Sequence, residues 1–177
     1  MSAKLPLLSA ALLLAPALMA QKLELKLDSV IARAKEHNVV DLDRAQLGAF
    51  ARLAAQKKPE KAEKAGQLLA GIEEVHVVNL EFDKDGQYSD ADLEPVRKQL
   101  QAPGWSRIVS VKERHESTEV YLMTKDGKAA GLAVINAEAR ELNIVHIVGS
   151  ISFDQARELV NSNIQYDLSQ LRKPDAR

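Results

Sequence analysis

The chain contains no cysteine in its 177 residues. This absence excludes a disulfide framework, a thiol nucleophile and a lipid-modified N-terminal cysteine. Aromatic residues are also scarce, at 4% of the chain against 46% for all hydrophobic residues. We therefore expect a core of Leu, Val, Ile and Ala that folds without covalent cross-links. A chain of this length is sufficient for one such domain and too short for two ordinary ones.

Neither sign of charge predominates. The chain has 24 Lys and Arg and 25 Asp and Glu, which gives a net charge of −1. Such a balance provides no long-range field to attract nucleic acid, and we expect no nucleic-acid partner.

Motifs for catalysis and cofactor binding are missing as well. No Gly precedes a Lys-Ser or Lys-Thr pair, so a phosphate-binding loop is absent. Gly149-Ser150 lacks the Gly-x-Ser-x-Gly setting that exposes a hydrolase nucleophile. We therefore assign no catalytic residue, no cofactor site and no metal ligand, and we favour a non-enzymatic role.

The N-terminus has the pattern of a secretory signal. Lys4 provides the positive start, and a mostly apolar run follows at 5–14. Cleavage after Ala17 fits a small-x-small pattern, whereas cleavage after Ala20 leaves the more natural mature start. The apolar run is too short for a comfortable transmembrane helix. We expect residues 1–20 to be removed, leaving a periplasmic or secreted protein with no stable membrane span.

The first part of the mature chain has helical periods. Asp28 is placed to cap a short helix that ends near residue 37, and residues 39–42 then form an extended link. Asp43 and Gln46 make a capping-box pattern at the start of a second helix. The face of this helix that we expect to point inward carries Leu47, Phe50, Leu53 and Ala54.

A third helix and a central strand are predicted next. Pro59 suits the first position of a helix, which we expect to end at Gly71. Residues 72–82 have an extended period with apolar residues on both faces, which is typical of a central strand. A helix over 90–101 follows, and Pro103-Gly104 ends it.

The second half of the chain is rich in strands with short connections. Asp126-Gly127 is a strong signal for a tight hairpin, because Gly accepts the positive φ that such turns need. Ser152 and Gln155 form another capping-box pattern, which predicts a final helix. The strands are expected at 105–114, 118–124, 129–136 and 141–151.

These elements predict a single α+β domain over residues 21–165, followed by a polar C-terminal tail at 166–177. The expected architecture is a mainly antiparallel sheet of about five strands, with helices packed on one face.

The segment from Glu81 to Asp92 resembles a calcium-binding loop. Oxygen-bearing side chains fall at its first, third, fifth, ninth and twelfth positions, and Gly stands at the sixth. However, Glu81 replaces the usual Asp, Tyr88 replaces an aliphatic residue, and a strand rather than a helix precedes the loop.

A turn followed by a helix cap explains the same residues. Asp85-Gly86 makes the turn, and Ser89 with Asp92 three residues later makes a capping pair. We favour this interpretation and keep a calcium-responsive module as an alternative.

Histidine and tryptophan provide the other candidate chemistry. His76 and His146 lie on apolar strand faces, where they would meet as zinc ligands only if a third and fourth ligand converged on them. A buried, hydrogen-bonded histidine is the favoured interpretation of each. His115 lies beside Glu113 in a predicted turn, and we expect it to be part of a solvated charge cluster. Trp105 is the single Trp, and we expect it to anchor the core.

Five segments in order resemble the bacterial family catalogued as domain of unknown function 4252, over about residues 39–160. They are LEFDKDG at 80–86, QLQAPGW at 99–105, EVY at 119–121, GLAV at 131–134 and IVGSI at 147–151. The resemblance implies an exported bacterial protein, and it transfers no catalytic residue. It also suggests a link to envelope stress signalling.

Three hypotheses follow. The first is a non-catalytic periplasmic or secreted module whose sheet edge or face binds another envelope protein. The second is an enzyme with an unrecognised site, for which His76, His146 and Glu113 are the first residues to test. The third is the calcium-responsive module at 81–92.

Overall fold

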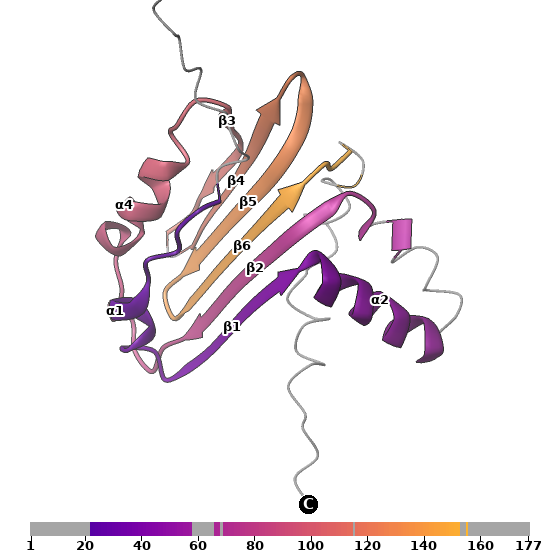
Figure 1. The fold of residues 1–177 in the computed structure, drawn as a ribbon. Helices are drawn as coiled ribbons and strands as arrows, with labels where there is room; N and C mark the ends of the chain where they lie inside the picture. Colours follow the sequence, from indigo (N-terminus) through magenta and orange to yellow (C-terminus); the bar gives the residue numbers. More distant parts are fainter. Residues whose placement is uncertain (1–21, 58–65, 68, 115, 153–154, 156–177) are drawn as a thin grey trace, which may run out of the picture.

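The computed structural model describes residues 22–57, 66–67, 69–114, 116–152 and 155 (Figure 1). Its centre is a six-stranded antiparallel sheet in the order β1-β2-β6-β5-β4-β3. The elements are α1 (Asp28–Ile31), β1 (Glu36–Asp43), α2 (Arg44–Lys57), β2 (Ile72–Glu81), α4 (Asp90–Gln99), β3 (Trp105–Lys112), β4 (Glu116–Lys125), β5 (Lys128–Glu138) and β6 (Glu141–Gly149). None of the helices in these ranges has the length and apolarity needed to cross a membrane.

The predicted class, a single α+β domain with a mainly antiparallel sheet, is confirmed, but the predicted count of about five strands is wrong. The strand that was missed is β1, whose central residues 39–42 were expected to be a link. Its burial alternates regularly along all eight residues, as in a strand with one face partly covered. Polar residues stand at both the partly buried and the exposed positions, so the pattern of hydrophobic residues did not indicate a strand.

The start of the mature domain also differs from the prediction. Helix α1 has four residues, with Leu27 rather than Asp28 at its N-cap, and no side chain caps it. The helix does not continue to residue 37, because the backbone N–H of Lys35 already donates to Glu81 O of β2 at 2.8 Å. Pairing with β2 therefore ends the helical conformation of the chain, and β1 begins at Glu36.

The capping box at the start of α2 is confirmed, but the inward face is wrong. The Asp43 N–H donates to Gln46 Oε1 and the Gln46 N–H donates to Asp43 Oδ1, each at 2.8 Å. Leu47 is buried, whereas Phe50 and Leu53 are exposed. In Figure 1, α2 extends away from the end of β1, so only its first turn lies close to the sheet.

Several predictions concern residues that the structure does not describe. These are the signal segment 1–20, most of the helix expected from Pro59, the helix expected after Ser152 and Gln155, and the tail 166–177. The capping pair that was to begin the last helix is present, since the Ser152 N–H donates to Gln155 Oε1 at 2.7 Å.

The four strands β3 to β6 form the predicted antiparallel meander. The hairpin between β4 and β5 turns at Asp126 and Gly127, whose φ values are 51° and 74°. Positive φ at both central residues is the geometry of the tight hairpin turn that the Asp-Gly pair predicted.

Apolar side chains form two clusters. The first cluster joins residues of α1 and α4 to strand residues such as Leu80 and Ile144. The second joins Leu47 of α2 to strand residues such as Val120 and Ile147. The fully buried members of the first cluster are Leu27, Val30, Leu80, Leu93, Val96, Ala133, Ile135, Leu142 and Ile144, and the second contains Leu47, Ile72, Val120, Leu132, Ile147 and Ile151.

Two rows of directly paired residues cross all six strands. Residues opposite each other in an antiparallel pair point to the same face, so each row lies on one face of the sheet. The valine row, on the side of the second cluster, is Val40, Val77, Val145, Val134, Val120 and Val109. The polar row, next to it on the opposite face, is Asp41, His76, His146, Ala133, Tyr121 and Arg107.

Helix α4 is tied to the sheet by a largely buried charge pair. The Arg97 guanidinium donates to Glu119 Oε1 of β4 from Nε at 2.8 Å, and its Nη2 lies 2.7 Å from the same oxygen. The hydroxyl of Tyr121 donates to the other oxygen, Glu119 Oε2, at 2.5 Å. Hydrogen bonds to a charged group of this kind fix the helix position as well as contributing stability.

The ends of β2 and β6 meet at two glycines. A Cβ at Gly149, where φ is +138°, would lie 2.2 Å from Gly71 O, and a Cβ at Gly71 would lie 2.5 Å from Ser150 O. The Ser150 N–H donates to Gly71 O at 2.9 Å, so the two backbones are in direct contact. Only glycine fits at either position.

We predict that Gly149→Ala lowers the free energy of unfolding by about 4 kcal/mol or prevents folding, because the added Cβ combines strain with a backbone clash. Gly86→Ala is the matched control, since Gly86 has φ +77° with open space around it, and about 1 kcal/mol is expected there. Urea unfolding of both variants measures the difference, and equal losses would contradict the role of the contact.

Candidate functional site

The acidic segment between β2 and α4 is a turn and a helix cap. Asp92 Oδ2 accepts hydrogen bonds from the backbone N–H and the hydroxyl of Ser89, at 2.9 and 3.1 Å. Asp92 Oδ1 accepts from Arg33 at 2.6 Å, and this hydrogen bond lowers the pKa of the Asp92 carboxyl. The predicted capping pair is therefore confirmed, and it also holds the segment after α1.

Two other carboxylates of this segment face arginines, one between β5 and β6 and one further along α4. Asp85 Oδ1 lies 2.6 Å from Arg140 Nε, and Asp90 Oδ1 lies 3.1 Å from Arg97 Nη1. Within the part of the chain that the structure describes, no group of three or more His, Asp or Glu side chains is placed to hold a metal ion. Lys35 lies near Glu81 and Asp83, at 3.9 and 4.0 Å, so the geometry is that of a turn whose charges are compensated by arginine and lysine.

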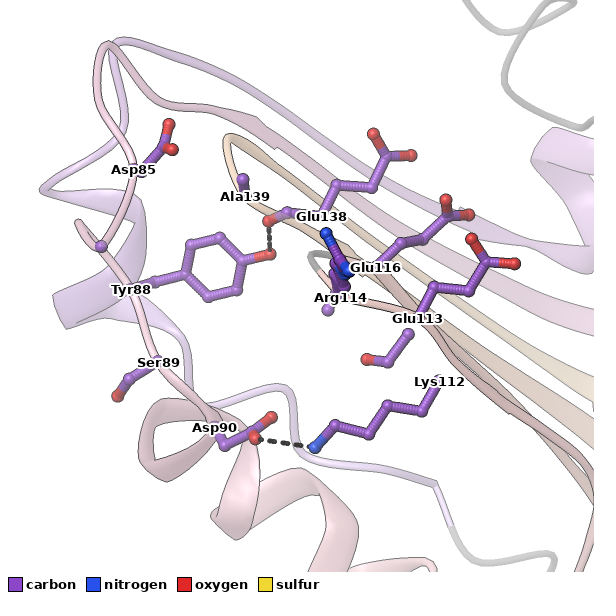
Figure 2. Close-up of a pocket in the computed structure, with 13 residues that line it drawn as sticks. Asp85, Tyr88, Ser89, Asp90, Lys112, Glu113, Arg114, Glu116, Glu138 and Ala139 are labelled. Carbon is purple, nitrogen blue, oxygen red and sulfur yellow. Dashed lines mark hydrogen bonds and ion pairs between the residues drawn. The ribbon is translucent and has the colours of Figure 1, made fainter.

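A pocket of about 340 Å³ lies between this turn and the β3–β4 and β5–β6 connections. Figure 2 shows Tyr88 projecting across it from the acidic turn toward Glu138, and Lys112 reaching toward Asp90. The Tyr88 hydroxyl contacts the backbone oxygens of Glu138 and Glu141, the latter at 2.8 Å. Burial, reinforced by nearby carboxylates, raises the pKa of Tyr88 to about 12. Tyr88 therefore remains a hydrogen-bond donor that ties the turn to the sheet.

Glu113 lies in the wall of this pocket, whereas His76 and His146 lie in the polar row across the middle of the sheet. The three residues named for an enzymatic site are thus not brought together. His115 lies outside the described residues.

His76 and His146 do meet, as a directly opposed pair on β2 and β6. Their rings stack at a centroid distance of 5.6 Å and an interplanar angle of 18°. His76 Nδ1 lies 2.5 Å from Asp41 Oδ1, and its Nε2 lies 3.0 Å from Glu74 Oε2. Both ring nitrogens of His76 therefore face carboxylate oxygens, one from β1 and one from β2. The prediction of a hydrogen-bonded histidine is confirmed for His76, and neither nitrogen remains for a metal.

His146 is in a different state from its neighbour. It is 1% exposed, and its Nδ1 has no hydrogen-bond partner within the described part of the chain. Burial, with the nearby charge of His76 second, lowers the pKa of His146 to about 4. The indole of Trp105 lies over the same region at a ring-centroid distance of 6.0 Å. Trp105 is buried in the first cluster, so its predicted role as a core anchor is confirmed.

The third candidate is strand β3, one of the two edges of the sheet. Seven of its eight residues are exposed, and among the strands described it pairs with β4 alone. Three of the exposed residues are large and apolar: Ile108, Val109 and Val111, at 47%, 37% and 49% exposure. An edge strand presents a row of backbone donors and acceptors to which another strand can pair. The sequence indicated this strand but not its place at the edge, because strand order depends on distant pairings.

The two faces of β3 differ in chemistry. Val109 ends the valine row, and Val111 lies two residues further on the same face. Arg107 ends the polar row on the other face, where Lys112 lies 3.8 Å from Asp90. The ladder between β3 and β4 is irregular between Arg107 and Val109, which is a bulge of the kind common on edge strands. Apolar residues and cations thus occupy opposite sides of one exposed strand.

Comparison with known proteins gives one match. The model of a family described as Domain of unknown function (DUF4252) matches residues 33–159. No curated protein and no solved structure matches the chain significantly.

We predict that the folded protein loses stability as the pH falls from about 6.5 to 4. The unfolded chain binds a proton at an ordinary histidine pKa near 6.5, whereas folded His146 binds one at about 4. The stability is complete above pH 6.5, and about 3 kcal/mol is lost on passing below the lower value. Urea unfolding at several pH values across this range measures the slope of the free energy of unfolding against pH.

His146→Phe should flatten the slope between pH 6.5 and 4, whatever its effect at neutral pH. Ile144→Val, in the same strand, is the control, since it trims a fully buried side chain but removes no titratable group and should leave the slope unchanged. An unchanged slope in His146→Phe would contradict the assignment.

Proposed function

The chain belongs to the DUF4252 family, and we propose that it is an exported, non-catalytic module that binds a polypeptide strand of an envelope protein along β3. The observation that carries the proposal is the exposed apolar edge formed by Ile108, Val109 and Val111. In such a mode the backbone of the edge strand gives affinity, and side chains on its two faces give specificity.

The alternation of chemistry on β3 supports strand addition over a flat protein–protein contact. A bound strand would place every second side chain beside Val109 and Val111, and the intervening ones beside Arg107 and Lys112. The expected partner segment is therefore extended, with apolar residues alternating with acidic ones.

The arrangement of the helices is part of the proposal. We place α1 and α4 as a layer over the polar-row face, in keeping with their residues in the first cluster. That layer leaves the opposite face of β3 accessible to a partner.

Export rests on the N-terminal pattern. Lys4 and the apolar run at 5–14 support a signal removed after Ala17 or Ala20, and hence a periplasmic or secreted protein. The envelope is then the compartment in which the partner is sought, with envelope stress signalling as the process to test first.

The state of the candidate catalytic residues favours binding over turnover. Both nitrogens of His76 face carboxylates, His146 is buried beneath Trp105, and Glu113 lies in a separate pocket. A general base must reach the proton that it removes, and this geometry offers substrate no access to the buried imidazole.

We predict that a photoactivatable label at position 110 captures the partner. The chain has no cysteine, so Ser110→Cys provides a unique thiol on β3, and Arg52→Cys provides an exposed one on α2, away from both edge strands. Illumination in envelope extracts should give a defined cross-link from Ser110→Cys that is absent from Arg52→Cys.

A second substitution makes the test specific. Val111→Glu places a charge in the apolar side of β3 and should reduce the cross-link at least tenfold, whereas Val39→Lys is the matched control. Val39 is 46% exposed on edge strand β1, close to the 49% of Val111. Equal cross-linking with and without Val111→Glu would refute binding at β3.

A further inference from the structure

We propose that the strand that pairs with β3 is β1 of a second copy of this chain, so that copies join head to tail into a continuous sheet. The inference rests on the proposed function and names its partner. Three properties of the two sheet edges support it: their direction, their charge and the residues that end each row.

The strand directions permit this pairing. Five antiparallel steps separate β1 from β3 across the sheet, so the two edge strands run in opposite directions. A second copy placed beside the first in the same orientation therefore presents β1 antiparallel to β3. Its faces are also preserved, with the valine row continuing on one side and the polar row on the other.

The edges carry opposite charges. β3 contains Arg107 and Lys112 and no acidic residue, while β1 contains Glu36, Asp41 and Asp43 and neither Lys nor Arg. Pairing β3 with β3 would bring cations together, and pairing β1 with β1 would bring carboxylates together. Like charges across a strand pair are destabilising, so the combination of β3 with β1 is the favoured one.

The row ends match as well. The polar row begins with Asp41 on β1 and ends with Arg107 on β3. Continuing that row into the next copy sets Arg107 beside Asp41. The valine row then continues in the same register, from Val109 of one copy to Val40 of the next. One register thus pairs charge with charge on one face and valine with valine on the other.

Such an interface is heterologous, because it joins two different surfaces. Each addition leaves one β3 edge and one β1 edge free, so assembly does not stop at two copies unless the accumulated twist closes a ring. The apolar edge of β3 is covered in every copy except the last.

Mixing two edge variants tests this geometry. Val39→Lys adds a cation to β1 and blocks that edge, and Val111→Glu adds a carboxylate to β3 and blocks the other. By sedimentation velocity, the wild-type chain should form species larger than a dimer as concentration rises, and each variant alone should remain monomeric. An equimolar mixture should form dimers and nothing larger, since one intact β3 meets one intact β1.

Three results would overturn the inference. They are a wild-type chain that stays monomeric at millimolar concentration, dimers of Val39→Lys alone, which would indicate β3–β3 pairing, and a mixture of the variants that remains monomeric. If the wild type is monomeric but the label at position 110 still captures another envelope protein, the proposed function stands and only the identity of its partner changes. If neither occurs, both fall.

Disulfide trapping gives an independent measurement of register. The row next to the polar row begins with Val39 on β1 and ends with Ser110 on β3. Opposed residues in an antiparallel pair lie within the Cα separation of a disulfide. Oxidation of a mixture of Ser110→Cys and Val39→Cys chains should therefore give a mixed disulfide. Ser106→Cys, which ends a row that begins with Leu42, should give at least tenfold less with Val39→Cys, and equal yields would refute the register.

Discussion

The pairing of β2 with β6 is the constraint on which the rest of the structure depends. These strands are opposed from Ile72 and Gly149 at one end to Glu81 and Glu141 at the other, although helix α4 and three strands lie between them in the chain. This long-range pairing joins the β1–β2 ladder to the β3–β6 meander, so that the six strands form a single sheet. It also opposes His76 to His146, completes both rows and sets β1 and β3 as the edges.

Local chemistry explains most of what could be predicted from the sequence. The Asp43–Gln46 box, the Ser89–Asp92 cap and the Asp126-Gly127 hairpin each depend on residues a few positions apart, and each is present. The errors lie where a distant partner decides. β1 was missed because its ladder with β2 ends a helix that local pattern favoured, and Phe50 and Leu53 are exposed because only the first turn of α2 approaches the sheet.

In the candidate site, too, features that depend on nearby residues were predicted, and features that depend on distant strands were not. Sequence patterns indicated that His76 and His146 lie on strand faces, but not that carboxylates from two strands enclose one ring while the other is buried. Nothing local distinguishes the valines of β3 from those of a central strand, since exposure depends on strand order. Once that order is known, the position of each charge on the two edges has a clear physical meaning.

The place of Trp105 gives the protein an internal optical probe. It is the single indole of the chain, it begins the edge strand β3, and its ring lies 6.0 Å from that of His146. An imidazolium quenches indole emission more strongly than a neutral imidazole does. Emission from the unlabelled protein therefore registers the protonation of a histidine in the middle of the sheet, and a spectral shift at the same residue registers a change in solvent at the start of β3.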